Sequence, residues 1–221
     1  IKNKHDLIHL LTLLDERYPS KKVDSQIRIY RIADDIDHRQ RWVRMHIVNE
    51  DNHVYGVVEN ITNEMLKLHK AEYERDHDVL TSLLNRRAYT EAMNELFKQR
   101  DELKVAALVM SDLDNLKYIN DTFGHDCGDG YIRLMAHVLK NTFPPKNSII
   151  SRISGDEFFV FIYGYESKEE IQQILVDYEK QMSECTWKLP DGSVSKLRAT
   201  SGVAWYPDDA TELTSLTKYA D

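Results

Sequence analysis

The fold class of this chain is first indicated by the decapeptide VAALVMSDLD at residues 105–114. Its first six residues form an unbroken apolar run, which is typical of a strand buried on both faces of a sheet. Two acids follow the run, and because side chains alternate along a strand, Asp112 and Asp114 are expected on the same side. The decapeptide therefore predicts a buried strand that ends in a pair of carboxylates.

Helical and strand-like patterns alternate around this decapeptide, from residue 78 to the end of the chain. Hydrophobic periodicity predicts helices at 88–100, 128–142, 168–182 and from 211, and strands at 148–153, 158–163, 195–200 and 203–206. The turn Ser154-Gly155-Asp156-Glu157, here termed the acidic turn, has the composition of a tight hairpin. We therefore expect an α/β sandwich, in which helices cover a sheet.

The first 77 residues show a different pattern. An amphipathic helix is expected at 6–18, and an antiparallel meander of three strands at 27–32, 41–48 and 53–58. Thr62 is expected to cap a charged connector helix that runs to about residue 77. Residues at positions 66, 69, 73, 76 and 80 form an imperfect heptad seam with polar residues in two core positions. Two interpretations of this helix remain, a solvated linker and a parallel dimeric coiled coil.

Composition limits the classes of protein to which the chain can belong. The 221 residues have a net charge of −8, with 42% hydrophobic and 30% charged residues, which favours two folded domains of unequal size. The negative charge argues against a nucleic-acid-binding protein, so a phosphate ligand is expected to need a metal ion. Cys127 and Cys185 are too far apart for a CxxC clip, which favours a reducing compartment. No apolar stretch is long enough to span a membrane, and membrane attachment could come only from segments outside this chain.

Both acidic pairs are candidate metal ligands. Asp112 and Asp114 repel each other unless a cation or hydrogen bonds compensate, and Mg²⁺ is typically held by one or two carboxylates together with substrate phosphates. The alternative is that they only cap the next helix. Asp156 and Glu157 follow the flexible Gly155, and the alternative for them is an ordinary polar turn. Two acidic sites on strands of one sheet form the arrangement used in two-metal phosphoryl transfer.

Residues 117–130, KYINDTFGHDCGDG, form a third candidate site. Its glycines are expected to open a helix whose N-terminus attracts anions, and its Asn and Asp side chains can read the edge of a purine. The GxxxxGK[ST] and GxGxxG phosphate motifs are absent. An EF-hand is excluded, because counting from Asp112 puts Lys117 at the required Gly and Phe123 at the required Glu.

These motifs together resemble the GGDEF domain of diguanylate cyclases over about residues 78–221. Residues 78–87, DVLTSLLNRR, resemble the family's DxLTGLxNRR, and residues 112–129 resemble DxDxFKxxNDxxGHxxGD. The acidic turn with Phe158 resembles the signature loop. The resemblance implies a βααββαβ sandwich related to polymerase palms and nucleotidyl cyclases, and a signalling transferase that condenses two GTP molecules into cyclic di-GMP and two pyrophosphates.

The resemblance also implies a role for each candidate residue. Asp112 and Asp156 would bind Mg²⁺, with Mn²⁺ as a substitute, through their carboxylates, and Leu113 through its carbonyl. Asp156 and Glu157 would be the catalytic residues. The remaining positions would bind GTP: Asn120 and Asp129 the guanine, and Lys117 with the backbone near Asn115 and Leu116 the triphosphate. Each domain would hold one GTP, so a homodimer is expected, in the cytoplasm where GTP is found.

Some residues depart from the family pattern. Ser154 replaces the first Gly of the signature, and activity is expected to survive. Asn115 and Leu116 stand where aromatic residues or His are usual. The family's inhibitory RxxD site is expected to be missing, since residues 145–148 read PKNS. The family continues beyond Asp221 into a phosphate-binding helix, so weak GTP binding is expected.

The N-terminal part resembles the second half of a PAS sensor domain. Residues 41–44, RWVR, and residues 55–62, YGVVENIT, resemble its closing strands and DIT exit motif, with Asn60 in place of Asp. The expected organisation is a partial PAS-like antiparallel sheet at 1–62, a connector helix at 63–77 and a GGDEF domain lacking its C-terminal end at 78–221. The leading hypothesis is a cyclase regulated by this sensor. The alternatives are a catalytically silent GGDEF domain that binds GTP or a partner protein and, more remotely, another nucleotidyl cyclase.

Overall fold

The computed structural model describes residues 9, 12–14, 16–18, 20–22, 26–33, 40–50 and 53–221. The chain divides between Tyr73 and Glu74 into two compact units, which we describe separately. Within the helix expected at 6–18, the described residues 9, 12–14, 16 and 17 are helical, and the rest of that helix lies outside the described residues.

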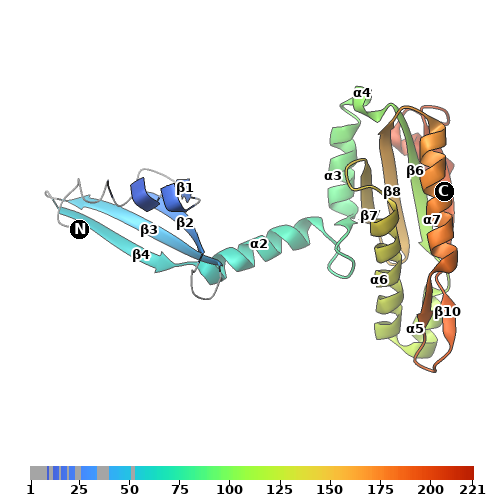
Figure 1. Ribbon diagram of the computed structural model, residues 1–221, viewed down its shortest axis with the longest axis horizontal. Helices are drawn as coiled ribbons and strands as arrows, with labels where there is room; N and C mark the ends of the chain where they lie inside the picture. Colours follow the sequence, from blue (N-terminus) through green and yellow to red (C-terminus); the bar gives the residue numbers. More distant parts are fainter. Residues whose placement is uncertain are drawn as a thin grey trace. The chain divides into compact units, whose positions relative to one another are not determined.

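The N-terminal unit contains an antiparallel sheet of four strands in the order β1-β2-β3-β4 (Figure 1). Its strands are β1 (Ser20–Lys22), β2 (Ile27–Ala33), β3 (Gln40–Glu50) and β4 (His53–Asn60). The meander predicted from the sequence is present as β2, β3 and β4. The first strand was not predicted, because three residues are too few to show an alternating pattern.

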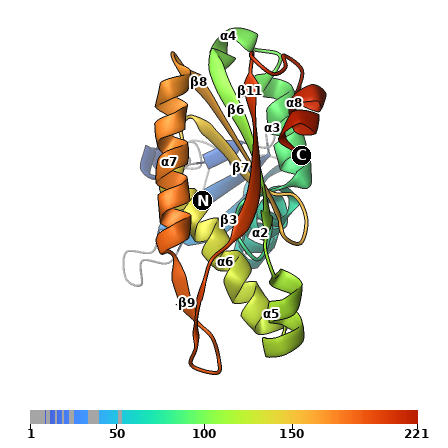
Figure 2. The ribbon, with the colours of Figure 1, turned by 90° about the vertical axis from the view of Figure 1, so that its right-hand side faces the viewer.

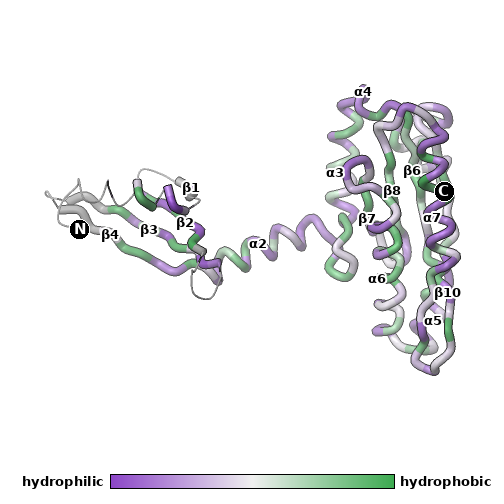
Figure 3. Tube along the Cα trace, viewed as in Figure 1, coloured by the Kyte–Doolittle hydropathy of each residue, from purple (hydrophilic) through white to green (hydrophobic). Residues whose placement is uncertain are grey.

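Helix α2 (Thr62–Asp76) follows β4, and none of its residues is buried. Thr62 is its first helical residue rather than its cap, because the Asn60 side-chain oxygen accepts hydrogen bonds from the amide and hydroxyl of Thr62 at 3.0 and 2.7 Å. Hydrophilic and hydrophobic segments alternate along the helix in Figure 3. Since the helix ends at Asp76, the expected heptad seam stops before Leu80.

The C-terminal unit contains a five-stranded sheet in the order β11-β6-β8-β7-β5. Its strands are β5 (Leu84–Asn85), β6 (Val105–Leu113), β7 (Ser148–Arg152), β8 (Glu157–Tyr165) and β11 (Ala199–Tyr206). The interior strand β6 is antiparallel to both of its neighbours, β8 and β11. The ends of these three strands form the scaffold of the acidic residues.

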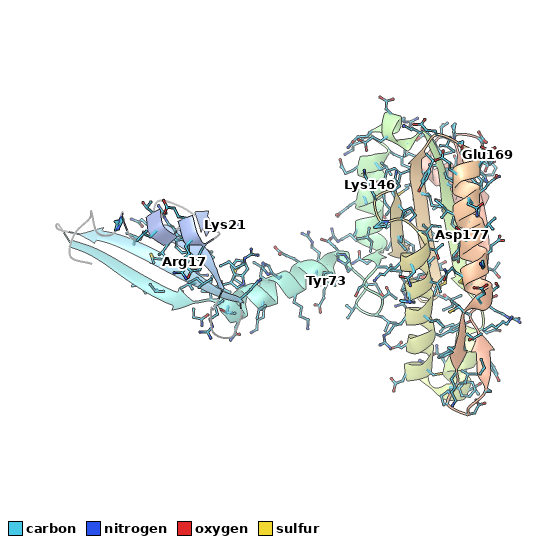
Figure 4. All side chains as sticks on the ribbon, viewed as in Figure 1. Arg17, Lys21, Tyr73, Lys146, Glu169 and Asp177 are labelled. Carbon is cyan, nitrogen blue, oxygen red and sulfur yellow. The ribbon has the colours of Figure 1, made fainter. Side chains whose placement is uncertain are left out.

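Helices cover both faces of this sheet. They are α3 (Arg86–Leu96), α4 (Arg100–Leu103), α5 (Leu116–Phe123), α6 (His125–Thr142), α7 (Lys168–Glu184) and α8 (Leu213–Ala220). Figure 2 shows α6 and α7 on one face and α3 and α8 on the other. Glu169 and Asp177 lie on the exposed side of α7 (Figure 4). The order β6-α5-α6-β7-β8-α7-β11 is the βααββαβ order that the family resemblance implies.

The apolar run in β6 is buried on both faces, as predicted. Ala107 and Val109 join the core beneath α6 and α7, while Ala106 and Leu108 join the core beneath α3 and α8. Burying one Val or Leu side chain stabilises a fold by about 1.5–3 kcal/mol, so this strand anchors the unit.

Several predicted boundaries were wrong. The helix expected at 88–100 begins at Arg86 and ends at Leu96, before the separate α4. The residues before 128 are not a loop, since they form α5 and the first turn of α6. The backbone turns before each of these helices, at Asn115 and Gly124, where φ is 63° and 86°. Side-chain periodicity carries no signal of such turns.

The strand expected at 195–200 is divided between two sheets. Residues of β10 (Val194–Lys196) pair with β9 (Thr186–Lys188) in a separate hairpin, whereas β11 begins at Ala199 and runs through the break expected at 201–202. The two strands differ because β10 has only β9 as a neighbour, while β11 pairs along its full length with β6.

Three hydroxyl groups, the buried Ser111 and Tyr178 and the exposed Ser201, meet between β6, β11 and α7. Ser111 and Ser201 are register partners, and their Oγ atoms lie 2.8 Å apart. The Tyr178 hydroxyl lies 3.2 Å from Ser111 Oγ. Buried hydroxyls are costly unless they are paired, so this contact favours one register of β11 on β6.

Candidate functional site

The strand ladder gathers the predicted metal ligands at one end of the sheet. Asp112, the penultimate residue of β6, is the register partner of Glu157 on β8 and of Thr200 on β11. The amide of Leu113 donates a hydrogen bond of 3.0 Å to the carbonyl of Asp156. Asp112 therefore comes together with Asp156 and Glu157, although more than forty residues separate it from them in the sequence.

The negative charges in this cluster affect one another. Burial, and then the charges of Asp156, Glu157 and Asp114, raise the pKa of Asp112 above its ordinary value. A carboxylate whose pKa is raised by neighbouring acids lacks a compensating cation. The cluster is thus electrostatically suited to a divalent ion.

The donor set also suits a hard cation. Two carboxylates and a backbone carbonyl offer oxygen ligands only, and Mg²⁺ commonly takes one or two carboxylates and completes its shell with water and substrate phosphates. Over the described part of the chain, no group of three or more His, Cys, Asp and Glu side chains is arranged to hold a metal ion on its own. Asp112 and Asp156 therefore fit an ion that is shared with a phosphate ligand.

Asp114 departs from the alternation expected of it, because β6 ends at Leu113. Its amide donates to the carbonyl of Arg198 at 3.0 Å, and its carboxylate accepts a 2.9 Å hydrogen bond from Thr200. It also lines a cleft of about 450 Å³ beneath α7, together with Tyr178. Asp114 is therefore already held by the protein, whereas Asp112 is not.

The acidic turn is held by two arginines. Nε and Nη2 of Arg152 donate to the carbonyl of Gly155 at 3.0 and 2.7 Å. Arg86 Nη2 lies 3.9 Å from the Glu157 carboxylate, and the Ser154 hydroxyl donates a short hydrogen bond to the same carboxylate. Glu157 is thus engaged within its own turn.

The predicted base-recognition residues lie on α5 and α6. The side chain of Asn120 lies against Gly128, so closely that a Cβ atom at Gly128 would be 1.9 Å from Asn120 Oδ1. Asp129 follows Gly128, and its carboxylate lies 3.9 Å from the guanidinium of Arg133. A glycine at 128 is therefore what allows the Asn120 carboxamide to lie against α6 at the residue before Asp129.

The other predicted residues surround the start of α5. Asn115 precedes the helix in a left-handed conformation, Leu116 is buried and Lys117 is exposed. Sequence reasoning missed Arg152 and Thr200. The signals available for them were a basic residue just before an acidic turn and a polar residue within an apolar strand.

Comparisons with known proteins agree with this geometry. A family model described as diguanylate cyclase, GGDEF domain, matches residues 75–221. Uncharacterized membrane proteins of Staphylococcus aureus are 31% identical over 143 residues, which is 64% of this chain and 40% of theirs, so the match spans less than half of those proteins. Over the described residues, the structure has no helix long and apolar enough to cross a membrane.

Solved structures show the same fold. The GGDEF domain of YfiN (TpbB) from Pseudomonas aeruginosa has a TM-score of 0.60 and 29% identity, covering 66% of this chain and 84% of that one. A sensory box/GGDEF family protein from Caulobacter crescentus has a TM-score of 0.55 and 29% identity, covering 66% and 93%. The coiled coil and GGDEF domain of DgcB from C. crescentus, in complex with c-di-GMP, has a TM-score of 0.62 at 23% identity, covering 73% and 84%.

Proposed function

The chain belongs to the GGDEF domain family of diguanylate cyclases, and on that premise we propose that its C-terminal unit condenses two GTP molecules into cyclic di-GMP and two pyrophosphates. The observation that carries the proposal is the convergence of Asp112, Asp156 and Glu157 at the ends of β6 and β8. Their mutual repulsion favours an ion and a phosphate between them.

Guanine recognition is assigned to Asn120 and Asp129. A carboxylate accepts hydrogen bonds from the N–H groups of guanine, and a carboxamide both donates and accepts. Adenine presents the opposite pattern at this edge, so ATP should be rejected. Lys117 and the backbone at Asn115 and Leu116 are assigned to the triphosphate.

Asp112 and Asp156 would hold Mg²⁺ with the carbonyl of Leu113. The bound ion supplies charge neutralisation at the phosphates and lowers the pKa of the attacking 3′-hydroxyl. Glu157 would orient that hydroxyl for in-line attack on the α-phosphate of the second GTP. Because each unit binds one GTP, two copies of the chain must face each other, and a homodimer is part of the proposal.

Regulation is assigned to the N-terminal unit. Its antiparallel sheet leads directly into α2, and because no residue of α2 is buried, this helix is suited to dimerise and to transmit a signal from a PAS-like sensor. The use of GTP places the catalytic unit in the cytoplasm. The names of the staphylococcal relatives are consistent with a membrane anchor in the full-length protein.

Product formation tests this proposal. Purified chain incubated with GTP and Mg²⁺, at a concentration where it is dimeric, should form cyclic di-GMP and release pyrophosphate. Asp156→Ala should abolish product, and Asp177→Ala on the exposed face of α7 is the matched control. An inactive dimer that still binds GTP would contradict the cyclase assignment.

A catalytically silent GTP-binding domain is the second candidate. The hydrogen bond from the Ser154 hydroxyl to the Glu157 carboxylate favours it, because a carboxylate engaged in its own turn is less available to substrate. Calorimetric GTP binding without turnover would support this second function.

A further inference from the structure

A second cleft lies on the face of α5 that is turned away from Asn120. It has a volume of about 580 Å³ and is lined by α5, the β9–β10 hairpin and the residues just after it. Figure 2 shows α5 and the hairpin extending from the same end of the C-terminal unit. Asn120, Gly128 and Asp129 do not line this cleft, so it is separate from the base-recognition residues. We call it the hairpin cleft.

The hairpin cleft is basic in an acidic protein. The chain has a net charge of −8, yet Lys196 and Arg198 line the cleft and none of its lining residues is acidic. Both side chains are exposed, and within the described residues neither takes part in an ion pair. Two cations with no partner, placed two residues apart on an extended segment, form a site for an anion.

The backbone that carries Arg198 is firmly held. Its amide donates to the Tyr131 hydroxyl at 2.9 Å, and its carbonyl accepts from the Asp114 amide at 3.0 Å. The backbone from which the Arg198 side chain extends is thus fixed, which lowers the entropic cost of binding a ligand.

Three aromatic residues line one side of the cleft. Tyr118 and Phe123 line it from α5, and Tyr131 lines it from α6. Tyr118 is 63% exposed, so its ring is accessible to a ligand in the cleft. Proteins often bind nucleotides with exposed rings and neighbouring cations. The base stacks on the ring, and the cations pair with the phosphates.

We propose that the hairpin cleft binds a nucleoside phosphate, with its base against Tyr118 and its phosphates on Lys196 and Arg198. The volume lies within the roughly 300–1,000 Å³ of typical small-molecule sites. None of the metal ligands, nor Asn120 or Asp129, lines this cleft, while Asn115, whose backbone is assigned to the triphosphate, lines its edge.

ADP in the presence of EDTA is the probe, because without metal the acidic cluster repels phosphates and the base-recognition pair is suited to guanine. Calorimetry on the full chain should show saturable binding of ADP, weaker binding of adenosine and weaker binding of pyrophosphate. The Tyr131 ring stacks on Trp187 with 5.2 Å between ring centroids, so the emission of Trp187 should change as ADP binds when Trp42 and Trp205 are replaced by Phe.

Three variants localise the binding. Lys196→Gln/Arg198→Gln should weaken ADP binding by at least about tenfold, since a charged hydrogen bond contributes roughly 1.5–3 kcal/mol. Lys146→Gln/Lys180→Gln, which removes the same charge from exposed positions elsewhere, should leave the affinity unchanged (Lys146 is labelled in Figure 4). Asn120→Ala should also leave it unchanged.

The proposal is overturned by any of four results. The first three are no saturable ADP binding, equal weakening in the two charge-matched double variants, and loss of ADP binding in Asn120→Ala, which would place ADP at the guanine site. Pyrophosphate that binds as tightly as ADP would also overturn it, because the aromatic residues would then contribute nothing.

Discussion

Arg152 binds Asp78 and the acidic turn at the same time. Its Nη1 lies 3.2 Å from both carboxylate oxygens of Asp78, while the same guanidinium donates two hydrogen bonds to the carbonyl of Gly155. The segment that opens the C-terminal unit is therefore linked directly to the turn that carries Asp156 and Glu157.

Replacing Asp78 with Asn should loosen the acidic turn. The Asp78 and Arg152 side chains are only 24% and 13% exposed, so losing this pair should lower the free energy of unfolding by about 1–3 kcal/mol. Cyclic di-GMP formation should fall with it. Asp208→Asn, which breaks the exposed pair with Lys168, should change stability by less than about 1 kcal/mol. Equal effects in urea-unfolding curves would contradict this prediction.

The same pair should give stability a characteristic pH dependence. Burial by itself raises the pKa of Asp78, but hydrogen bonds from Thr81 and the charge of Arg152 hold that pKa below its ordinary value. A carboxyl whose folded pKa is lowered stabilises the fold above its unfolded pKa, near 3.9, and the contribution is lost as the pH falls through the folded pKa. The stability difference between wild type and Asp78→Asn should thus be constant at neutral pH and shrink below about pH 4. A difference that grows on acidification would rule this out.

Gly128 and Gly130 offer a matched pair of substitutions within α6. Gly128→Ala places a methyl group 1.9 Å from Asn120 Oδ1 and should displace this side chain, weakening GTP binding by about tenfold or more. Gly130→Ala meets only Trp187 at 3.6 Å and should stabilise the helix by about 0.5–1 kcal/mol without loss of GTP affinity. Calorimetry with GTP separates the two, and comparable affinities would argue against Asn120 as a base contact.

Asp112→Asn should raise thermal stability while it removes activity. Burial and the neighbouring acids raise the pKa of Asp112, so its ionised form destabilises the fold above that pKa, and this cost disappears as the pH falls through it. The melting temperature of the variant should exceed that of wild type at pH 7 in EDTA, and the two should converge in acid. Asp177→Asn, on the exposed face of α7, should change neither property.

Ser154→Gly should increase turnover if Glu157 acts on substrate. The change removes the hydroxyl that donates to Glu157 and frees the backbone of the turn. Ser154→Ala removes the hydroxyl alone, so comparing the two initial rates separates the hydrogen bond from the backbone effect. Unchanged rates in both variants would mean that Ser154 does not restrain the site.

Much of the fold could be predicted because burial imposes a pattern on sequence. The apolar run of β6 follows directly from the burial of that strand on both faces of the sheet. The predicted boundaries were wrong where the backbone conformation determines where an element begins. Asn115 is an example, because its left-handed conformation immediately precedes α5. The two-residue strand β5 depends on β7, a partner distant in sequence, and its own residues carry too little pattern to reveal it.

The acidic residues of the site could be predicted from the sequence, but the residues that contact and position them could not. Asp112 and Asp156 were selected because carboxylates at strand ends are unusual, and the register explains their proximity. Arg152 and Thr200 were missed because their roles depend on contacts to residues 74 and 86 positions away. Such contacts leave no local periodicity.

The contact of the Ser201 hydroxyl with the buried hydroxyls of Ser111 and Tyr178 has a consequence for the pairing of β11 with β6. A slip of one residue in the pairing of β11 with β6 would turn Ser201 to the other face and leave the hydroxyls of Ser111 and Tyr178 buried without this partner. A chain in which β11 pairs with β6 in the wrong register is therefore less stable than the native chain. The three hydroxyls thus favour the native register of β11 on β6. A register shifted by one residue, in which Thr200 no longer faces Asp112, would lose their contact.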